Sequence, residues 1–174
     1  DDNGAVKEPI RNLAPSGNRR MGSNPHTNGG VLRKDLLFPA IEKYAVPVDM
    51  PGTTEHENTY PLGEVIRDLI RHNPNGYKLF GPDETHSNRL QAVYEVSKKV
   101  WMANFLPVDL NGSELARDGS VIEMLSEHTL VGMMEGYLYT GRNGFFHTYD
   151  AFAPATSSLE NQHCKRPAHP AATP

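Results

Sequence analysis

Three groups of polar side chains follow apolar segments that are typical of β-strands, and these residues are the best suited to chemistry. The groups are Gly81 to Arg89, then Ser126 to His128, and then His147, Tyr149, Asp150 and Phe152. Ligands of open parallel sheets bind beyond the carboxyl ends of the strands. We therefore expect the three groups to converge on one edge of a sheet.

Glu127 is the residue of greatest interest, because it lies between an apolar strand segment and an apolar helix segment. Burial in such a place would raise the pKa of a carboxyl group, whereas the amino end of the following helix favours the charged form. The alternative is an ordinary acidic residue in the first turn of a surface helix. Both interpretations stay open.

Ser87 and Asn88 precede a second predicted helix, where their side chains could bind an oxyanion such as phosphate or simply cap the helix. Asp83 and Glu84 in the same loop are acids that could hold nearby backbone amides. Tyr149 and Phe152, three residues apart, could form a platform for stacking a ring or could pack in the core.

Other site chemistries find little support. His128 and His147 have no partner at metal-ligand spacing, so no metal site is expected. Ser126, His128 and Asp83 could form a hydrolase triad, but no nucleophile elbow accompanies them.

The elements that must position these residues follow from apolar spacing. Leu62, Val65, Ile66, Leu69 and Ile70 recur at helical intervals and predict one amphipathic helix. After it we expect a strand at 77–80, a helix at 90–101 and a strand at 121–125. A further helix should follow a cap at Ser126, and a last strand should lie at 145–149. The residues of this further helix that we expect to be buried are Leu130, Met133, Met134, Tyr137 and Leu138. Gly132 and Gly136 would let that last helix approach a neighbour closely. This alternation predicts an α/β fold with a parallel sheet.

The chain divides into three parts by composition. Residues 1–60 are rich in proline and are predicted to form an extended arm, with one short helix near 31–41. Residues 61–165 carry the α/β pattern. The proline-rich residues 166–174 are predicted to be a disordered tail.

The 174 residues carry a net charge of −4, which disfavours nucleic acid as a partner. A single cysteine, Cys164, favours a reducing, cytoplasmic location. We expect no membrane association, because no apolar run approaches the roughly 20 residues that span a bilayer. The first residue is Asp1, which suggests a piece of a longer protein.

Three ordered motifs resemble the phosphoketolases, thiamine-diphosphate enzymes that act on xylulose 5-phosphate and fructose 6-phosphate. The motifs are Arg20-Met-Gly-Ser-Asn-Pro-His-Thr-Asn-Gly-Gly30, then Leu79-Phe-Gly-Pro-Asp-Glu-Thr-His-Ser-Asn-Arg-Leu90, and then a series from Glu123 to His163 that includes Ser126-Glu-His128 and Thr148-Tyr-Asp-Ala-Phe152. The resemblance covers roughly residues 19–165. It places the chain at the entry to, and in the first half of, the pyrimidine-binding domain.

The resemblance implies a lyase reaction, in which a ketose phosphate is cleaved with inorganic phosphate to give acetyl phosphate, an aldose phosphate and water. Glu127 matches the glutamate that hydrogen-bonds the aminopyrimidine ring nitrogen of the cofactor, which serves as the electron sink. Tyr149 and Phe152 match aromatics that pack about that ring. Asp83 matches an acid near the cofactor, and Ser87 matches a serine that binds the sugar phosphate.

The resemblance also implies that much of the active site lies elsewhere. Family enzymes are homodimers several times longer than this chain, and another domain holds the cofactor's diphosphate and Mg²⁺. The Gly-Asp-Gly signature of that domain is absent here. We therefore expect a fragment that is inactive alone. The alternative is a non-catalytic partner that docks onto a full-length phosphoketolase.

Overall fold

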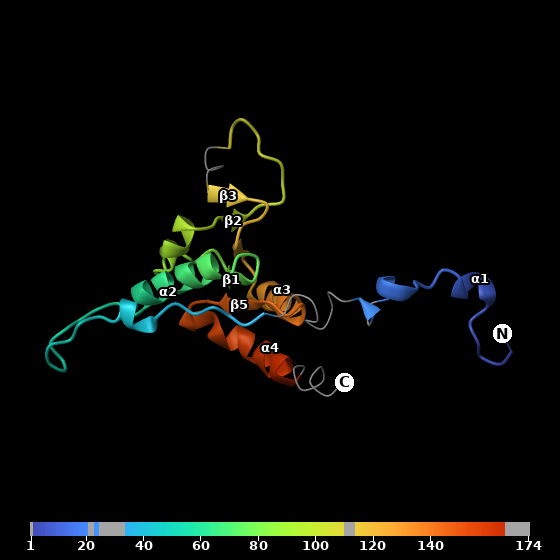
Figure 1. Ribbon diagram of the computed structural model, residues 1–174, viewed down its shortest axis with the longest axis horizontal. Helices are drawn as coiled ribbons and strands as arrows, with labels where there is room; N and C mark the ends of the chain where they lie inside the picture. The colour runs from blue at the N-terminus through green and yellow to red at the C-terminus, as the bar shows by residue number, and fades with distance from the viewer. Residues whose placement is uncertain (1, 21–22, 25–33, 110–113, 166–174) are drawn as a thin grey trace.

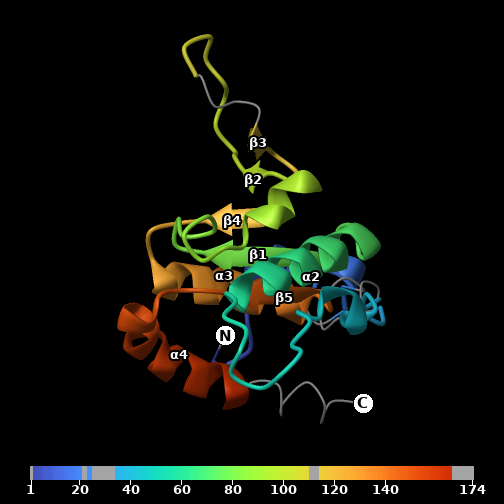
Figure 2. The ribbon, with the colours of Figure 1, turned by 90° about the vertical axis from the view of Figure 1, so that its left-hand side faces the viewer.

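The computed structural model describes residues 2–20, 23–24, 34–109 and 114–165, and these ranges contain a five-stranded parallel sheet (Figure 1). The strands are β1 (Tyr77–Gly81), β2 (Lys99–Val100), β3 (Leu115–Ala116), β4 (Val121–Glu123) and β5 (Asn143–Phe146). Their order in the sheet is β3-β2-β4-β1-β5, which Figure 2 shows from top to bottom. The predicted α/β class with a parallel sheet is therefore confirmed.

β1 lies inside the sheet, and its side chains alternate between two faces. Leu79 and Tyr77 point toward α2 (Thr59–His72) and belong to the buried core. Phe80 faces α3 (Glu127–Tyr139), where its ring centroid lies 5.9 Å from that of Tyr137. Helices thus cover both faces of β1, and the strand is held so that its carboxyl end meets those of β4 and β5.

The core forms where α2 packs onto the sheet. The predicted amphipathic helix is confirmed, and its apolar stripe buries Ile66, Leu69 and Ile70. Gly63 lets the chain after β1 come close, because a Cβ at this position would lie 2.8 Å from the carbonyl oxygen of Arg89. The buried apolar cluster consists of Ile66, Leu69, Ile70, Tyr77, Leu79, Leu90, Val93 and Val121.

α3 begins where the sequence predicts, because the Ser126 Oγ accepts a hydrogen bond of 3.3 Å from the Thr129 amide. Its buried residues are Leu130 and Val131, whereas Met133 is 40% exposed. The prediction that Met133 is buried is therefore wrong. Within the described chain nothing lies within 4 Å of a Cβ built at Gly132 or Gly136, so the expected close neighbour is not found there.

The predicted helix at 90–101 is wrong. The chain forms only a short 3-10 helix, η4 (Gln91–Glu95), and then the strand β2. Val93, Val96 and Val100 are β-branched, which lowers helix propensity and suits strands. Lys99 pairs with Val121 of β4, so the need to extend the sheet decides the conformation here.

Two further strand boundaries differ from expectation. β4 stops at Glu123, and Leu125, which was predicted to lie in the strand, is 83% exposed. β5 covers 143–146 instead of 145–149, and the short 3-10 helix η6 (Asp150–Phe152) and α4 (Ala153–Lys165) follow it. No helix was predicted after the last strand.

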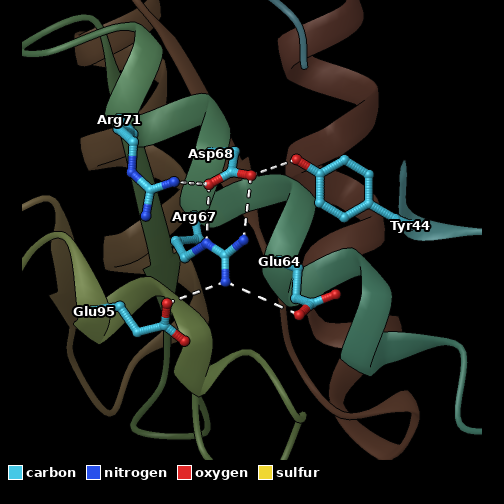
Figure 3. A network of polar contacts seen from close by, with 6 residues as sticks. All are labelled: Tyr44, Glu64, Arg67, Asp68, Arg71 and Glu95. Atoms are coloured by element: carbon cyan, nitrogen blue, oxygen red, sulfur yellow. Dashed lines mark hydrogen bonds and ion pairs between the residues drawn. The ribbon is translucent and has the colours of Figure 1, made fainter. Parts of the chain in front are cut away.

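Part of the proline-rich arm is attached to α2. Asn73 accepts a hydrogen bond of 2.9 Å from the Leu37 amide and donates one of 3.0 Å to the Leu37 carbonyl. Tyr44 lies in the 3-10 helix η3 (Ile41–Tyr44) and donates a 2.5 Å hydrogen bond to Asp68 of α2 (Figure 3). Of the predicted 31–41 helix, residues 34–40 form no helix and Ile41 begins η3, so the short helix of the arm lies later in the chain than predicted.

The earlier part of the arm contains two short elements, α1 (Glu8–Arg11) and the 3-10 helix η1 (Gly17–Arg19), and neither has a buried residue. Most of the motif at 20–30 and the whole predicted tail at 166–174 lie outside the described residues. Among the helices of the described chain, none has both the length and the apolar character needed to cross a membrane.

Candidate functional site

The three polar groups meet at the carboxyl edge formed by β1, β4 and β5, as expected. The His147 amide donates a hydrogen bond of 2.9 Å to the Phe80 carbonyl, and the Met124 amide donates one of 3.3 Å to the Gly81 carbonyl. The segments that follow the three strands therefore start side by side. Glu84, Ser87 and Asn88 from the first segment contact residues of the third.

The loop after β1 is a series of tight turns. The Asn88 amide donates to the Glu84 carbonyl at 2.8 Å, and the Leu90 amide donates to the Thr85 carbonyl at 2.9 Å. Arg89 has a left-handed backbone with φ of 62°, which stops any helix from starting at Ser87. The helix amino end that was expected to favour an oxyanion at Ser87 and Asn88 is therefore not formed.

Glu84 is the most buried acid of this loop, with 7% of its surface exposed. Its carboxylate lies 3.4 Å from the Asn88 side-chain nitrogen and accepts from the Tyr149 backbone amide. Burial raises the pKa of Glu84, and the negative charge of Glu127 raises it further. The expectation that Glu84 holds nearby amides is confirmed.

Ser87 is exposed and held between two partners. Its hydroxyl donates to the Glu84 carbonyl at 3.2 Å and accepts a hydrogen bond from the hydroxyl of Tyr149. The structure thus joins a predicted phosphate-binding residue directly to a predicted cofactor-binding residue, although 62 positions separate them in the chain.

Tyr149 and Phe152 form an exposed aromatic pair. Their ring centroids lie 6.4 Å apart with an angle of 30° between the planes. Tyr149 is 37% exposed and Phe152 is 48% exposed. The alternative that these rings pack in the core is therefore wrong for this chain. Two large aromatic faces at the carboxyl edge of a sheet are suited to contact with a planar ring.

Glu127 is the first residue of α3 and is only partly buried. The position agrees with the interpretation as a first-turn acid, and it also lies close enough to Glu84 to affect that group's pKa. Ser126 is the cap of α3, and its hydroxyl lies 3.0 Å from the Thr129 hydroxyl. Because the Ser126 hydroxyl caps the helix, the structure does not support a hydrolase triad of Ser126, His128 and Asp83.

Asp83 belongs to a neighbouring cavity of about 250 Å³ beside the ends of β2 and β4. It is mostly exposed, and its carboxylate lies 3.8 Å from the ammonium of Lys99. Trp101 and Glu123 line the same cavity. Asp83 therefore lies beside Lys99 at the β2 and β4 end of the carboxyl edge.

Glu123 is a largely buried acid, with 10% of its side chain exposed, that sequence reasoning passed over. It accepts hydrogen bonds from Thr85 at 2.6 Å and Tyr94 at 3.0 Å, and Lys99 lies at 2.6 Å. Burial acts to raise the pKa of Glu123, but the hydrogen bonds from Lys99 and Thr85 outweigh it and lower the pKa. The signal that could have revealed it is a charged residue inside an apolar strand, since such a residue needs a partner.

His147 is also buried at this edge, with 7% of its surface exposed. Burial lowers the pKa of His147 to about 4, and the nearby charge of Glu123 acts in the opposite direction. Its Nδ1 lies 2.9 Å from the Asn88 side-chain nitrogen. Among the described residues, no group of three or more His, Cys, Asp or Glu side chains could hold a metal ion.

Comparison with known proteins agrees with this description. The family described as D-xylulose 5-phosphate/D-fructose 6-phosphate phosphoketolase matches residues 60–173. Similar curated proteins include a probable phosphoketolase of Thermosynechococcus vestitus, 56% identical, and one of Methylococcus capsulatus, 53% identical. Each match covers 95% of this chain. The chain spans about a fifth of the length of these relatives, 20% in both cases.

Proposed function

This chain belongs to the D-xylulose 5-phosphate/D-fructose 6-phosphate phosphoketolase family, and from that premise we propose that it carries the pyrimidine-binding half of a thiamine-diphosphate active site. The proposed reaction is a lyase reaction that cleaves xylulose 5-phosphate, fructose 6-phosphate or both with inorganic phosphate. Its products are acetyl phosphate, an aldose phosphate and water. Thiamine diphosphate, when bound, supplies the electron sink for the carbon–carbon cleavage.

The residues present fit the pyrimidine end of this cofactor. Tyr149 and Phe152 expose their rings at the carboxyl edge of the sheet, and we assign them to the face of the aminopyrimidine. Glu127 begins α3 at the same edge, and we assign it to hold a proton at the aminopyrimidine ring nitrogen. The raised pKa of neighbouring Glu84 supports this placement, because it reflects two carboxylates and reduced access to water.

Two further residues are assigned to the periphery of the site. Ser87 would turn its one hydroxyl proton from the Glu84 carbonyl to the phosphate of the sugar, while the hydrogen bond from Tyr149 keeps the Ser87 oxygen in place. Asp83, with Lys99 beside it, would lie near the cofactor without contacting the aromatic pair. The single observation that carries the proposal is the hydroxyl contact between Tyr149 and Ser87, because it joins the two subsites.

The remaining parts of the active site would come from sequence outside this chain. They include the groups that hold the diphosphate and Mg²⁺, and a second subunit in a homodimer that works in the cytoplasm. The supporting observation is that relatives are about five times as long as this chain, which covers 20% of them. We expect no acetyl phosphate from the isolated chain.

The proposal is tested by a chimera in which this chain replaces the matching segment of the Thermosynechococcus vestitus relative. We expect the chimera to form acetyl phosphate from xylulose 5-phosphate and phosphate within about tenfold of the relative's rate, which corresponds to about 1.4 kcal/mol. The isolated chain serves as the negative control. A folded, cofactor-binding chimera that forms no acetyl phosphate would contradict the proposal.

A second candidate function is docking of this chain onto a full-length phosphoketolase. It is favoured by exposed apolar side chains beyond β2 and β4, namely Trp101, Met102, Phe105, Leu106, Val108, Met124 and Leu125. Co-purification of the chain with the relative would support docking. A monomer on size exclusion that does not bind the relative would exclude it.

A further inference from the structure

We propose that His147 is a positioning residue, which holds the Ser87–Asn88 turn so that the Ser87 hydroxyl can meet the sugar phosphate. This inference rests on the proposed function, since it assumes that Ser87 binds that phosphate. Within the described part of the chain, the His147 side chain forms no hydrogen bond with the aromatic pair or with Ser87. It acts through Asn88, whose side-chain nitrogen lies 2.9 Å from His147 Nδ1.

The direction of this hydrogen bond follows from Glu84. The Asn88 side-chain nitrogen donates a hydrogen bond of 3.4 Å to Glu84 Oε2, and an amide nitrogen can donate but cannot accept. The Asn88 amide must therefore present its NH₂ group to both neighbours. His147 Nδ1 must then accept, which makes the imidazole neutral with its proton on Nε2.

The imidazole is held in place by packing as well as by this bond. A Cβ built at Gly81 would lie 2.0 Å from His147 Nε2, so the ring occupies the space that a side chain at position 81 would need. Its Nε2 is buried and has no hydrogen-bond partner among the described residues. The residue is therefore tied to the end of β1 on one side and to the Ser87–Asn88 turn on the other.

The titratable groups near His147 come from several elements. Glu84 lies in the loop after β1 and meets Asn88, Glu123 lies at the end of β4, and Tyr149 follows in the same segment as His147. The hydrogen-bond partner of the neutral imidazole is Asn88, which donates its NH₂ group to Nδ1. A side chain without an acceptor at the Nδ1 position would leave the Asn88 amide, and so the Ser87 hydroxyl, without this support.

The test uses the chimera with two substitutions at one position. His147→Leu fills similar space but lacks the acceptor, and His147→Asn keeps an acceptor near the Nδ1 position. We expect His147→Leu to raise KM for xylulose 5-phosphate about tenfold, while the dissociation constant for thiamine diphosphate changes less than twofold. His147→Asn should restore KM to within about threefold of the parent.

A second test removes the same contact from the other side. Asn88→Ala should raise KM for the sugar phosphate by a similar factor, and the double variant with His147→Leu should be no worse than either single variant. Hydrogen exchange, which does not depend on activity, should be faster in peptides covering residues 83–90 of His147→Leu and unchanged in His147→Asn.

The possible failures are distinguishable. A parent chimera that forms no acetyl phosphate would refute the proposed function and leave the exchange comparison to decide the role of His147. An unchanged KM in His147→Leu, or equal effects of the leucine and asparagine substitutions, would overturn the positioning role. Independent effects in the double variant would overturn it as well. If His147→Leu does not fold, Asn88→Ala and His147→Asn provide the same comparison.

Discussion

Two polar clusters of this molecule differ in whether their ionisable groups favour the charged or the neutral form. On α2, Asp68 is surrounded by Arg67, Arg71 and Tyr44, and Arg67 also reaches Glu95 (Figure 3). The hydrogen bond from Arg67 lowers the pKa of Asp68 well below its usual value, although partial burial acts against this. Every charge in this arm-anchoring cluster has an opposite charge beside it.

At Glu84 and His147 of the carboxyl edge, unlike at the paired Glu123 beside them, burial outweighs pairing. It raises the pKa of Glu84 and lowers that of His147, so both shifts favour the neutral form. The edge also exposes Tyr149 and Phe152. The cluster on α2 pairs its charges and attaches the arm, whereas the edge holds groups with unpaired shifts and exposed rings, which supports the proposed ligand site. Perturbed groups of that kind are concentrated at functional sites.

The largest effect is expected from Gly81→Ala, which would break the edge cluster by packing. The new Cβ would overlap the His147 ring at 2.0 Å, so the ring or the strand must move. We expect the free energy of unfolding of the chain to fall by about 3 kcal/mol in urea denaturation. Gly132→Ala is the matched control, because open space surrounds that position, and it should stabilise the helix by up to about 1 kcal/mol. Equal effects of the two substitutions would contradict the packing described here.

The pH dependence of stability should separate the two clusters. The pKa of His147 is about 4 in the folded chain against 6.5 as the usual value, so the unfolded state binds more protons between these pH values. Stability from His147 is therefore fully present above pH 6.5 and lost as the pH falls toward 4, by about 3 kcal/mol in total. His147→Asn should remove this loss.

Asp68 acts in a different window. Because its pKa is lowered from 3.8, its contribution is present above that pH and is lost at more acidic values. Glu84 has the opposite sign, since its raised pKa stabilises the fold at low pH and this contribution is lost as the pH rises above 4.5. The difference between parent and His147→Asn curves isolates the histidine. Identical curves above pH 4 would contradict its burial in the neutral form.

A moderate effect is expected from Asp68→Asn, which would weaken the arm-anchoring cluster. It removes the negative charge that faces Arg67 and Arg71, and we expect a loss of about 2 kcal/mol in urea denaturation. Glu64→Gln is the control, because Glu64 is half exposed and lies 4.0 Å from Arg67, and its effect should stay below about 0.5 kcal/mol. If Asp68→Asn left the free energy of unfolding unchanged, the cluster would not be what attaches the arm.

The smallest effect on stability is expected from Tyr149→Phe. The substitution keeps the ring and removes the hydroxyl that contacts Ser87. Unfolding free energy should change by less than about 0.5 kcal/mol, while KM of the chimera for xylulose 5-phosphate should rise about threefold. Ser157→Ala, at an exposed position on α4, is a control for hydroxyl loss. An unchanged KM would contradict the proposal that Tyr149 supports the phosphate subsite at Ser87.

The sequence predicts those parts of the fold in which local pattern and burial agree. The stripe on α2, the Ser126 cap of α3 and the strand at 77–80 are examples, and their polar neighbours therefore converge as expected. The segment 90–101 fails because pairing of Lys99 with Val121 outweighs a weak helical pattern, and such pairing involves residues distant in the chain. Local spacing carries no information about that partner.

The site shows the same division. Ser87 and Tyr149 could be singled out by resemblance, but their contact across 62 positions could not. Glu123 was missed as a site residue, and His147 was placed at the edge without a role, because their importance arises from burial and from partners such as Lys99 and Asn88. Only the folded arrangement brings these groups together.

The most direct test of the central claim is acetyl phosphate formation by the chimera carrying Glu127→Gln, compared with the exposed-site control Glu42→Gln. If the chain supplies the pyrimidine half-site, Glu127→Gln should lower kcat by roughly 10²- to 10⁴-fold, as expected for loss of a group that holds a proton in the reaction. Glu42→Gln should retain the parent rate. Equal rates for the two variants would contradict the assignment of Glu127 and, with it, the proposed site.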